Sequence, residues 1–136
     1  MGLILIDSTV IVAFLDRDDA LHRPTVARFR ELLATEALTA SVISYAEVMT
    51  GASLGHHEER NVDGFFETFL SELLSVDRFV AARAAALRGG RPSLAMPDAL
   101  ILATADLHQE IDEVLCADRE WLKVRGLNCT VELIKP

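Results

Sequence analysis

The stretch Leu-Ile-Leu-Ile-Asp-Ser-Thr, residues 3–9, is the part of the sequence that decides the fold. Four consecutive apolar residues predict a short strand buried on both faces, because a strand with one face in water alternates apolar and polar residues. We expect the strand to stop where polar residues begin, at Asp7. Ser8 or Thr9 can then cap a helix over residues 10–15. The chain therefore opens in the order strand, acid, helix.

Further short strands and helices alternate along the rest of the chain. Apolar residues at helical spacing predict helices over residues 21–33, around 45–49, and over 56–74, 78–88 and 99–108. Strands are predicted at residues 38–40, 113–116 and 131–134, a minimal strand or a turn at 75–77, and a loop at 89–93. Gly51 is expected to end or bend the helix around 45–49.

This alternation indicates the class of fold. Short strands that alternate with helices predict an α/β fold, here a three-layer α/β/α domain with a short, mostly parallel central sheet. No repeat or long linker divides the chain, and 136 residues of 51% hydrophobic content suffice for one core. We therefore expect residues 1–136 to form a single domain.

The charge balance limits how the protein can bind nucleic acid. The chain has 13 Lys and Arg against 21 Asp and Glu, which gives a formal net charge of −8. This argues against a protein that holds nucleic acid by bulk attraction. Charges are screened beyond roughly 8 Å at physiological salt, so a local basic rim can still serve a nuclease.

Two features bear on the compartment. The apolar run at the N-terminus reaches Asp7 too soon for a membrane segment and has no basic leader, so we expect a soluble, cytoplasmic protein with no membrane partner. Cys116 and Cys129 lack metal-type spacing, and we interpret them as reduced, mostly buried small hydrophobes. A disulfide between them is the less favoured interpretation.

Four acids stand where open α/β sheets build their sites, beyond the carboxyl ends of the strands. Asp7 and Asp118 follow predicted strands, and Asp98 begins a helix just after Pro97. Glu47 lies in the early turns of the helix after the second strand. Taken singly, each acid has a structural explanation as a helix cap, a turn residue or part of a solvated helix face.

Their shared setting favours a functional interpretation. Asp7, Glu47 and Asp98 each interrupt an otherwise apolar stretch that contains no Lys or Arg. Burying an isolated carboxylate is costly unless a positive group compensates it. A hard divalent cation is the better candidate, since Mg²⁺ and Mn²⁺ prefer carboxylate and water oxygens.

At this point the sequence resembles the PIN domain family and, within it, the VapC toxins of bacterial and archaeal toxin–antitoxin pairs. The matching segments are residues 5–10, 44–51, 97–105 and 116–121. They occur in the family's order and at similar separations, and the ordered set is specific where no single segment is. The chain departs from the family pattern at Cys116, where a hydroxyl residue is common, and in the order of the small polar pair after the first Asp.

The resemblance implies a divalent-metal-dependent endoribonuclease that is the toxin of such a pair. Its implied catalytic acids, which would also bind Mg²⁺ or Mn²⁺, are Asp7, Glu47, Asp98 and Asp118. Asp7 and Asp98 would be the central ligands, and Asp118 would bind a second, weaker ion. Glu47 would be a ligand or a water-orienting base, and a hydroxyl of Ser8 or Thr9 would support the site. The metal would activate a water for in-line attack on the RNA phosphodiester.

The expected partners are RNA, a cognate antitoxin protein and a second copy of the chain. Basic residues predicted near the acids are candidates for contacts with the RNA backbone, namely Arg17, Arg91, Arg119, Lys123 and Arg125. For each of them a solvated surface charge is an equally good explanation. The apolar stripe over residues 56–74 is expected to be core, although the resemblance implies that helices here also bind the antitoxin and a homodimer partner. The antitoxin would bring an Arg or Lys to the acidic pocket.

Two other functions stay open. A non-catalytic PIN-like binding module would keep the fold and use its acids structurally, although retention of all four acids argues against it. An aspartate-nucleophile phosphotransfer domain also has an Asp after its first strand, yet that class usually has a second acid where this chain has Thr9. Covalent phosphorylation of Asp7 would favour phosphotransfer, and metal-dependent cleavage would favour the nuclease.

Overall fold

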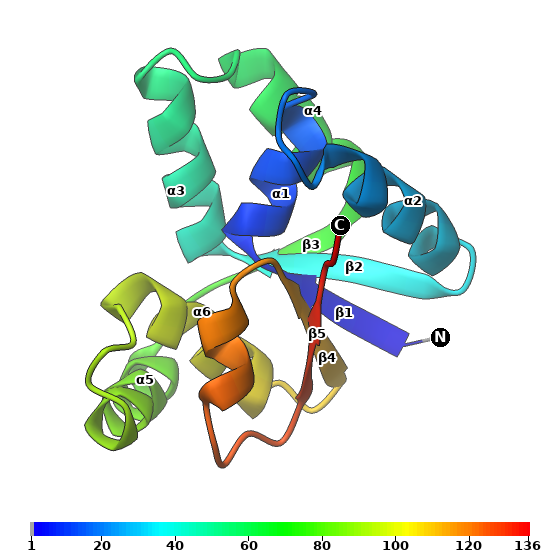
Figure 1. Cartoon of the computed structure of the whole chain (residues 1–136). Coiled ribbons are helices and arrows are strands. Elements are labelled where there is room, and N and C mark those ends of the chain that lie inside the picture. The colour runs from blue at the N-terminus through cyan, green and yellow to red at the C-terminus, as the bar shows by residue number, and fades with distance from the viewer. Residues whose placement is uncertain (1) are drawn as a thin grey trace.

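A computed structural model describes residues 2–136 and shows one parallel sheet between two layers of helices (Figure 1). The sheet has the order β3-β2-β1-β4-β5, and all four neighbouring pairs run parallel. The strands are β1 (Gly2–Ile6), β2 (Glu36–Ser41), β3 (Leu70–Leu74), β4 (Ile111–Cys116) and β5 (Thr130–Leu133). The predicted three-layer α/β/α fold is confirmed.

The helices divide between the two faces of the sheet (Figure 1). Above the sheet in this view lie α1 (Ser8–Leu15), α2 (His22–Leu33), α3 (Val42–Ser53) and α4 (Glu59–Phe69). Below it lie α5 (Arg78–Gly90), α6 (Met96–Leu107) and the short 3₁₀ helix η1 (Arg119–Lys123). Among residues 2–136, no helix combines the length and the apolarity that crossing a membrane needs.

Strand β1 explains why the chain begins with an apolar run. It lies at the centre of the sheet, so its alternate side chains enter both cores. Leu3 and Leu5 pack into the core under α5 and α6, whereas Ile4 and Ile6 pack into the core under α1 to α4. Both free cysteines are buried, as predicted.

One boundary was predicted wrongly. The helix expected over residues 56–74 ends at Phe69, and residues 70–74 form strand β3; residues 75–77, expected to be a minimal strand or a turn, follow as a loop. Periodicity alone does not separate a helix end from a short apolar strand. Pairing with β2 decides the outcome, since β3 is parallel to β2 and its Ser71 hydroxyl donates to the Leu38 carbonyl.

Helix ends account for the smaller corrections. Asp7, rather than Ser8 or Thr9, is the N-cap of α1 and accepts from the Thr9 N–H. Helix α3 continues through Gly51 to Ser53 instead of ending there. Gly89 and Gly90, expected in a loop, form the last turn of α5, and η1 was not predicted.

Aromatic packing joins the helices of the upper layer. Phe14 of α1 stacks on Phe29 of α2 at a ring-centroid distance of 5.0 Å. It also contacts Phe65 and Phe69 of α4, each at 5.2 Å. The apolar stripe of α4 therefore lies largely in the core, as its spacing predicted.

This packing predicts a large difference between two equal truncations. Phe29→Ala should lower the free energy of unfolding by about 3–5 kcal/mol, because Phe29 is 1% exposed and its loss leaves a cavity. Phe79→Ala, at a side chain that is 68% exposed, should cost less than about 1 kcal/mol. Urea unfolding of both variants measures this difference, and equal losses would contradict the assigned core.

Candidate active site

The sheet changes winding direction at β1. The chain leaves β1 for α1 on the upper layer, whereas the segment after β4 enters η1 on the lower layer (Figure 1). Adjacent parallel strands whose connections go to opposite faces leave a crevice at their carboxyl ends, where ligands bind in open α/β sheets. Asp7 follows β1 and Asp118 follows β4, so both acids stand at this crevice.

Asp7 is the most constrained acid of the crevice. It is 1% exposed, and its backbone N–H donates to the Leu115 carbonyl of β4 at 2.9 Å. Its Oδ2 accepts from the Thr9 hydroxyl at 2.6 Å and from the Thr9 N–H at 3.4 Å. The carboxylate therefore has one fixed orientation at the end of the central strand.

Two hydroxyls extend this anchoring to neighbouring elements. The Ser8 Oγ donates to Glu47 Oε1 at 2.9 Å and lies 3.3 Å from Asp7 Oδ1. A serine has one hydroxyl proton, so the shorter contact to Glu47 is the stronger bond. The Thr9 Oγ1 accepts from the Ala117 N–H at 3.2 Å. Ser8 thus ties Asp7 to α3, and Thr9 ties it to the loop after β4.

The other three acids come from three further segments. Glu47 lies on the second turn of α3 with its side chain exposed. Asp98 lies in the first turn of α6 and is half-buried. Asp118 is also half-buried and caps η1, since its Oδ1 accepts from the Glu120 N–H at 2.9 Å.

Electrostatics show that these acids act on one another. Burial, followed by the charges of Asp7 and Asp118, raises the pKa of Asp98 to about 6. Loss of hydration raises the pKa of Glu47, and the charge of Asp98 adds to this effect. Burial also raises the pKa of Asp7 despite the hydrogen bonds from Thr9, and Glu47 adds a repulsive charge. The four carboxylates therefore share one negative field.

Within residues 2–136, no basic side chain forms an ion pair with any of the four acids. The ion pairs formed within residues 2–136 involve Glu31, Glu58, Asp106, Glu120 and Glu132, and none of the four site acids. Uncompensated carboxylates at a partly buried site are costly, so the arrangement attracts a cation.

The donor atoms fit a hydrated divalent cation. Across the described chain, no three Asp, Glu, His or Cys side chains converge closely enough to bind one ion directly as a group. Mg²⁺ usually retains several waters and takes only one or two protein carboxylates directly. The oxygen-only donor set and its uncompensated charge therefore suit Mg²⁺ or Mn²⁺, with some carboxylates acting through water.

Two buried residues complete the surroundings of the acids. The Cys116 Sγ donates to the Asp118 carbonyl at 3.5 Å, and burial raises the pKa of this thiol to about 12, which keeps it protonated. Trp121 is 1% exposed, and its indole N–H finds no hydrogen-bond partner within residues 2–136. This N–H lies close enough to Asp98 to lower the pKa of that carboxyl slightly. Sequence reasoning missed Trp121, whose only signal is a large aromatic residue three positions after an acid.

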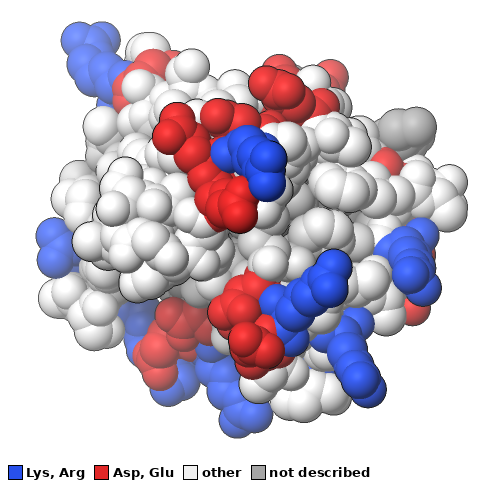
Figure 2. Space-filling view, turned by 90° about the horizontal axis from the view of Figure 1, so that it is seen from above, with Lys and Arg blue, Asp and Glu red and all other residues white. Residues whose placement is uncertain are grey.

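The five candidate RNA contacts fall in different places. Arg91, Lys123 and Arg125 line one hollow between α5 and the η1 segment. Arg119 is exposed at the start of η1, directly after Asp118, whereas Arg17 lines a separate hollow with Phe14 and Arg60. On the face shown in Figure 2, basic side chains stand in separate patches beside acidic ones, without a continuous basic surface.

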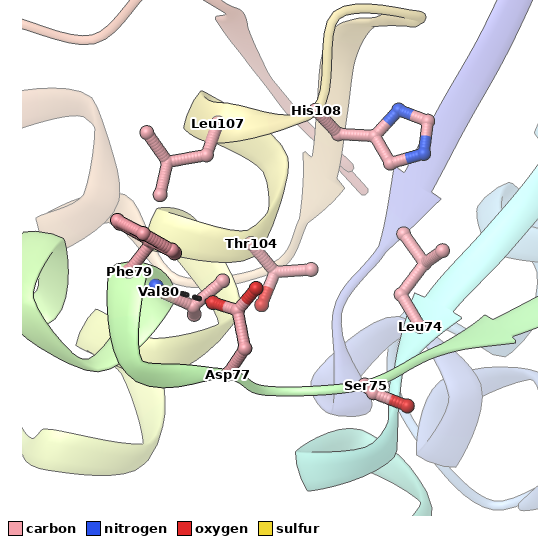
Figure 3. A pocket seen from close by; sticks show the side chains of 8 residues that line it. All are labelled: Leu74, Ser75, Asp77, Phe79, Val80, Thr104, Leu107 and His108. Carbon is pink, nitrogen blue, oxygen red and sulfur yellow. Dashed lines mark hydrogen bonds between the residues drawn. The ribbon is translucent and has the colours of Figure 1, made fainter.

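Another hollow of about 460 Å³, lined by equal numbers of apolar and polar residues, lies beside the first turn of α5 and the last turn of α6 (Figure 3). None of the four site acids lines it. Its one carboxylate, Asp77, already accepts from the Val80 N–H at 2.9 Å as the cap of α5. This hollow is therefore not part of the acidic site.

Comparison with known proteins decides the family. A family model for the PIN domain matches residues 4–127. The chain belongs to the PIN domain family. The resemblance seen in the four sequence segments is thereby confirmed. Comparison with curated protein sequences gave no match.

Solved structures share the architecture of this PIN domain. A toxin–antitoxin complex from Klebsiella pneumoniae is similar at 29% identity and a TM-score of 0.67, covering 95% of this chain and 96% of that one. VapBC2 from Rickettsia felis, bound to a DNA fragment from its promoter, matches at 14% identity and a TM-score of 0.77, covering 98% and 99%. VapC20 from Mycobacterium tuberculosis, a sarcin–ricin loop cleaving toxin, matches at 14% and 0.71, covering 92% and 97%. At 14% identity the likeness shows the fold alone.

The shared negative field predicts that the PIN domain is destabilised by its own site. The folded-state pKa of Asp98, about 6, lies above its ordinary value of 3.8. The protonated carboxyl therefore favours the folded state, and this stabilisation is fully present below about pH 4 and is lost as pH rises through 6. In EDTA, Asp98→Asn should therefore raise the melting temperature by a few degrees near pH 8 and by less near pH 5.

Thermal unfolding monitored by circular dichroism measures this effect. Asp18→Asn, at an exposed acid between α1 and α2, removes the same charge and should show no such pH dependence. A shift from Asp98→Asn that is equal at both pH values would contradict the electrostatic assignment.

Proposed function

We propose that this PIN domain protein is a divalent-metal-dependent endoribonuclease, the toxin component of a toxin–antitoxin pair that acts in the cytoplasm. The observation that carries the proposal is the gathering of Asp7, Glu47, Asp98 and Asp118 at one crevice without an ion-pair partner within residues 2–136. Burial raises the pKa of Asp7, Glu47 and Asp98, and neighbouring site acids add to each shift. Two similar structures support the biological role, since one is described as a toxin–antitoxin complex and the other as a sarcin–ricin loop cleaving toxin.

The position of each acid suggests its role in binding a metal. Asp7 and Asp98 would be the central ligands, because Asp7 is held by Thr9 and Asp98 begins a rigid helix. Asp118 would bind a second, weaker ion. A bound Mg²⁺ or Mn²⁺ would supply Lewis-acid activation of a water and of the scissile phosphate.

Glu47 is the best-placed proton acceptor. Its side chain is exposed to solvent, its Oε1 is oriented by the Ser8 hydroxyl at 2.9 Å, and its raised pKa makes it a stronger base than an ordinary carboxylate. Water attack on phosphorus would release the 3′ oxygen, with products that carry 5′-phosphate and 3′-hydroxyl ends. The attacking water would lose its proton towards Glu47.

The burial of Asp7 disfavours the phosphotransfer alternative. A nucleophilic carboxylate needs an oxygen that reaches the phosphorus atom, yet Asp7 is 1% exposed. Its Oδ2 is occupied by the Thr9 hydroxyl at 2.6 Å. The cleavage assay described below distinguishes the binding-module alternative from the nuclease.

The partners of the proposed toxin follow from its relatives and from its charge. Similar structures from Rickettsia felis and Salmonella typhimurium are VapBC complexes, which supports a cognate antitoxin for this chain. An antitoxin Arg or Lys inserted among the four acids would neutralise the field that a metal otherwise relieves. A homodimer completes the proposed assembly.

Metal-dependent cleavage tests the proposed function. Purified, antitoxin-free protein should cut a mixed RNA pool with Mg²⁺ or Mn²⁺ and lose this activity in EDTA. Asp7→Asn and Asp98→Asn should each reduce the rate by roughly a hundredfold or more, because each removes a charge that holds the metal. Asp18→Asn is the matched control and should cut as the wild type does. Equal cutting by all variants, or none by the wild type, would favour the binding module.

Metal binding is measurable without any substrate. At a Mn²⁺ concentration of about a hundred times Kd, binding to the folded state alone should add roughly 2.7 kcal/mol to stability. The melting temperature of the wild type should therefore rise with Mn²⁺, whereas that of Asp7→Asn and Asp98→Asn should rise much less. An equal rise in all three proteins would place the cation elsewhere.

A further inference from the structure

A basic groove lies between the C-terminal half of α5 and the segment that contains η1. We call it the α5–η1 groove; it has a volume of about 270 Å³, and its charged lining residues are Arg83, Arg91, Lys123 and Arg125. Both of its walls lead to the acidic crevice along the chain. Residues 92–97 connect Arg91 to Asp98, and Asp118 directly precedes η1.

Arg83 forms the rigid wall of this groove. Its Nε donates to Asp106 Oδ2 at 2.7 Å, and the side chain of Asp106 is 1% exposed. Its Nη2 donates to the Gly126 carbonyl at 2.7 Å, and Gly126 adopts a positive φ of 78°. Asp106 also accepts from the Asn128 N–H. These bonds fix the loop after η1 against α5 and α6, so Arg83 is structural rather than a ligand.

Two other cations already converge on one anion. Glu120 Oε2 accepts from Arg91 Nη2 at 2.7 Å, and Glu120 Oε1 accepts from Lys123 Nζ at 3.0 Å. One group with two oxygens thus spans both side chains. The two non-bridging oxygens of a phosphodiester offer the same pair of acceptors, and Arg and Lys are the side chains that most often bind phosphate.

The groove keeps an excess of positive charge after these pairs form. Its four cations face two acids, Asp106 and Glu120, which leaves a net charge of +2 in a chain of −8. Arg125 is exposed and forms no ion pair within residues 2–136. The Glu120 side chain is 55% exposed, so water screens its hold on Arg91 and Lys123 and an incoming anion can replace it.

We propose that the α5–η1 groove is a phosphate-binding subsite for the backbone of the RNA substrate, in which a phosphate displaces Glu120 from Arg91 and Lys123. This inference rests on the proposed nuclease function and specifies where the substrate continues beyond the acids. The acids repel the RNA backbone, and the groove, whose walls lead to Asp98 and Asp118 along the chain, would supply the compensating attraction. Glu120 occupies the subsite in the free protein and competes with RNA for it.

RNA binding in EDTA tests the subsite apart from catalysis. Fluorescence anisotropy with a labelled single-stranded RNA of about ten nucleotides gives Kd at several salt concentrations. The Lys123→Ala/Arg125→Ala double variant should bind roughly four- to thirtyfold more weakly, on the order of two- to sixfold per exposed contact. The plot of log K against log salt has a negative slope, and its magnitude should decrease by about 1.4 in this variant. Each of the two lost phosphate contacts removes about 0.7 on single strands.

Glu120→Gln should change the RNA affinity in the opposite direction. Removing the internal anion should tighten RNA binding roughly threefold or more, because Arg91 and Lys123 become free. The matched control is Arg30→Ala/Arg60→Ala, which removes two exposed cations from the upper layer and leaves the groove intact. This control should change Kd by less than about twofold. In Mn²⁺, Lys123→Ala/Arg125→Ala should raise KM for RNA with little change in kcat.

The outcomes separate the subsite from the nuclease. If the groove variant and the control variant bind RNA equally, or if Glu120→Gln weakens binding, the subsite is overturned even though the wild type cuts RNA. If binding responds as expected but no RNA is cut, the subsite stands and the nuclease proposal fails. Far-ultraviolet circular dichroism of each variant confirms that the fold is retained.

Discussion

Everything at the crevice depends on one constraint, the burial of the Asp7 carboxylate at the end of the central strand. The β1 backbone is fixed on both sides by β2 and β4, and the bond from the Asp7 N–H to the Leu115 carbonyl extends this pairing to the acid itself. Thr9 then orients the carboxylate and joins it to Ala117. A carboxylate held this firmly and hydrated this poorly is costly unless a positive group compensates it.

This constraint connects stability with function. Acids from four separate segments converge where the sheet changes winding direction. Burial, with the charges of Asp7 and Asp118 added to it, raises the pKa of Asp98 to about 6. An Arg or Lys placed here would neutralise the acids and weaken their attraction for any cation. Basic side chains gather instead in the α5–η1 groove, where Arg91 and Lys123 converge on Glu120. Under the two proposals, the acids would attract a metal and the groove would attract a phosphate.

The sequence predicted the parts of this design that local patterns control. The apolar run of residues 3–6 is a buried central strand, and acids that follow strands or begin helices meet at one edge because parallel strands end together. The boundary between α4 and β3 was missed, since pairing with β2 rather than periodicity fixes it. The contacts of Trp121 with Asp98 and of Arg91 with Glu120 were also missed, because the partners come from distant parts of the chain and leave no local signal.

The central claim is that these four acids form the cation site of the protein. Anomalous diffraction from crystals grown with Mn²⁺ tests it most directly, because the anomalous signal locates manganese without assumptions about activity. The account predicts a manganese peak in the crevice among Asp7, Glu47, Asp98 and Asp118, absent from crystals of Asp98→Asn. A fully diffracting crystal with no manganese at the crevice, or with its only manganese elsewhere, would contradict it.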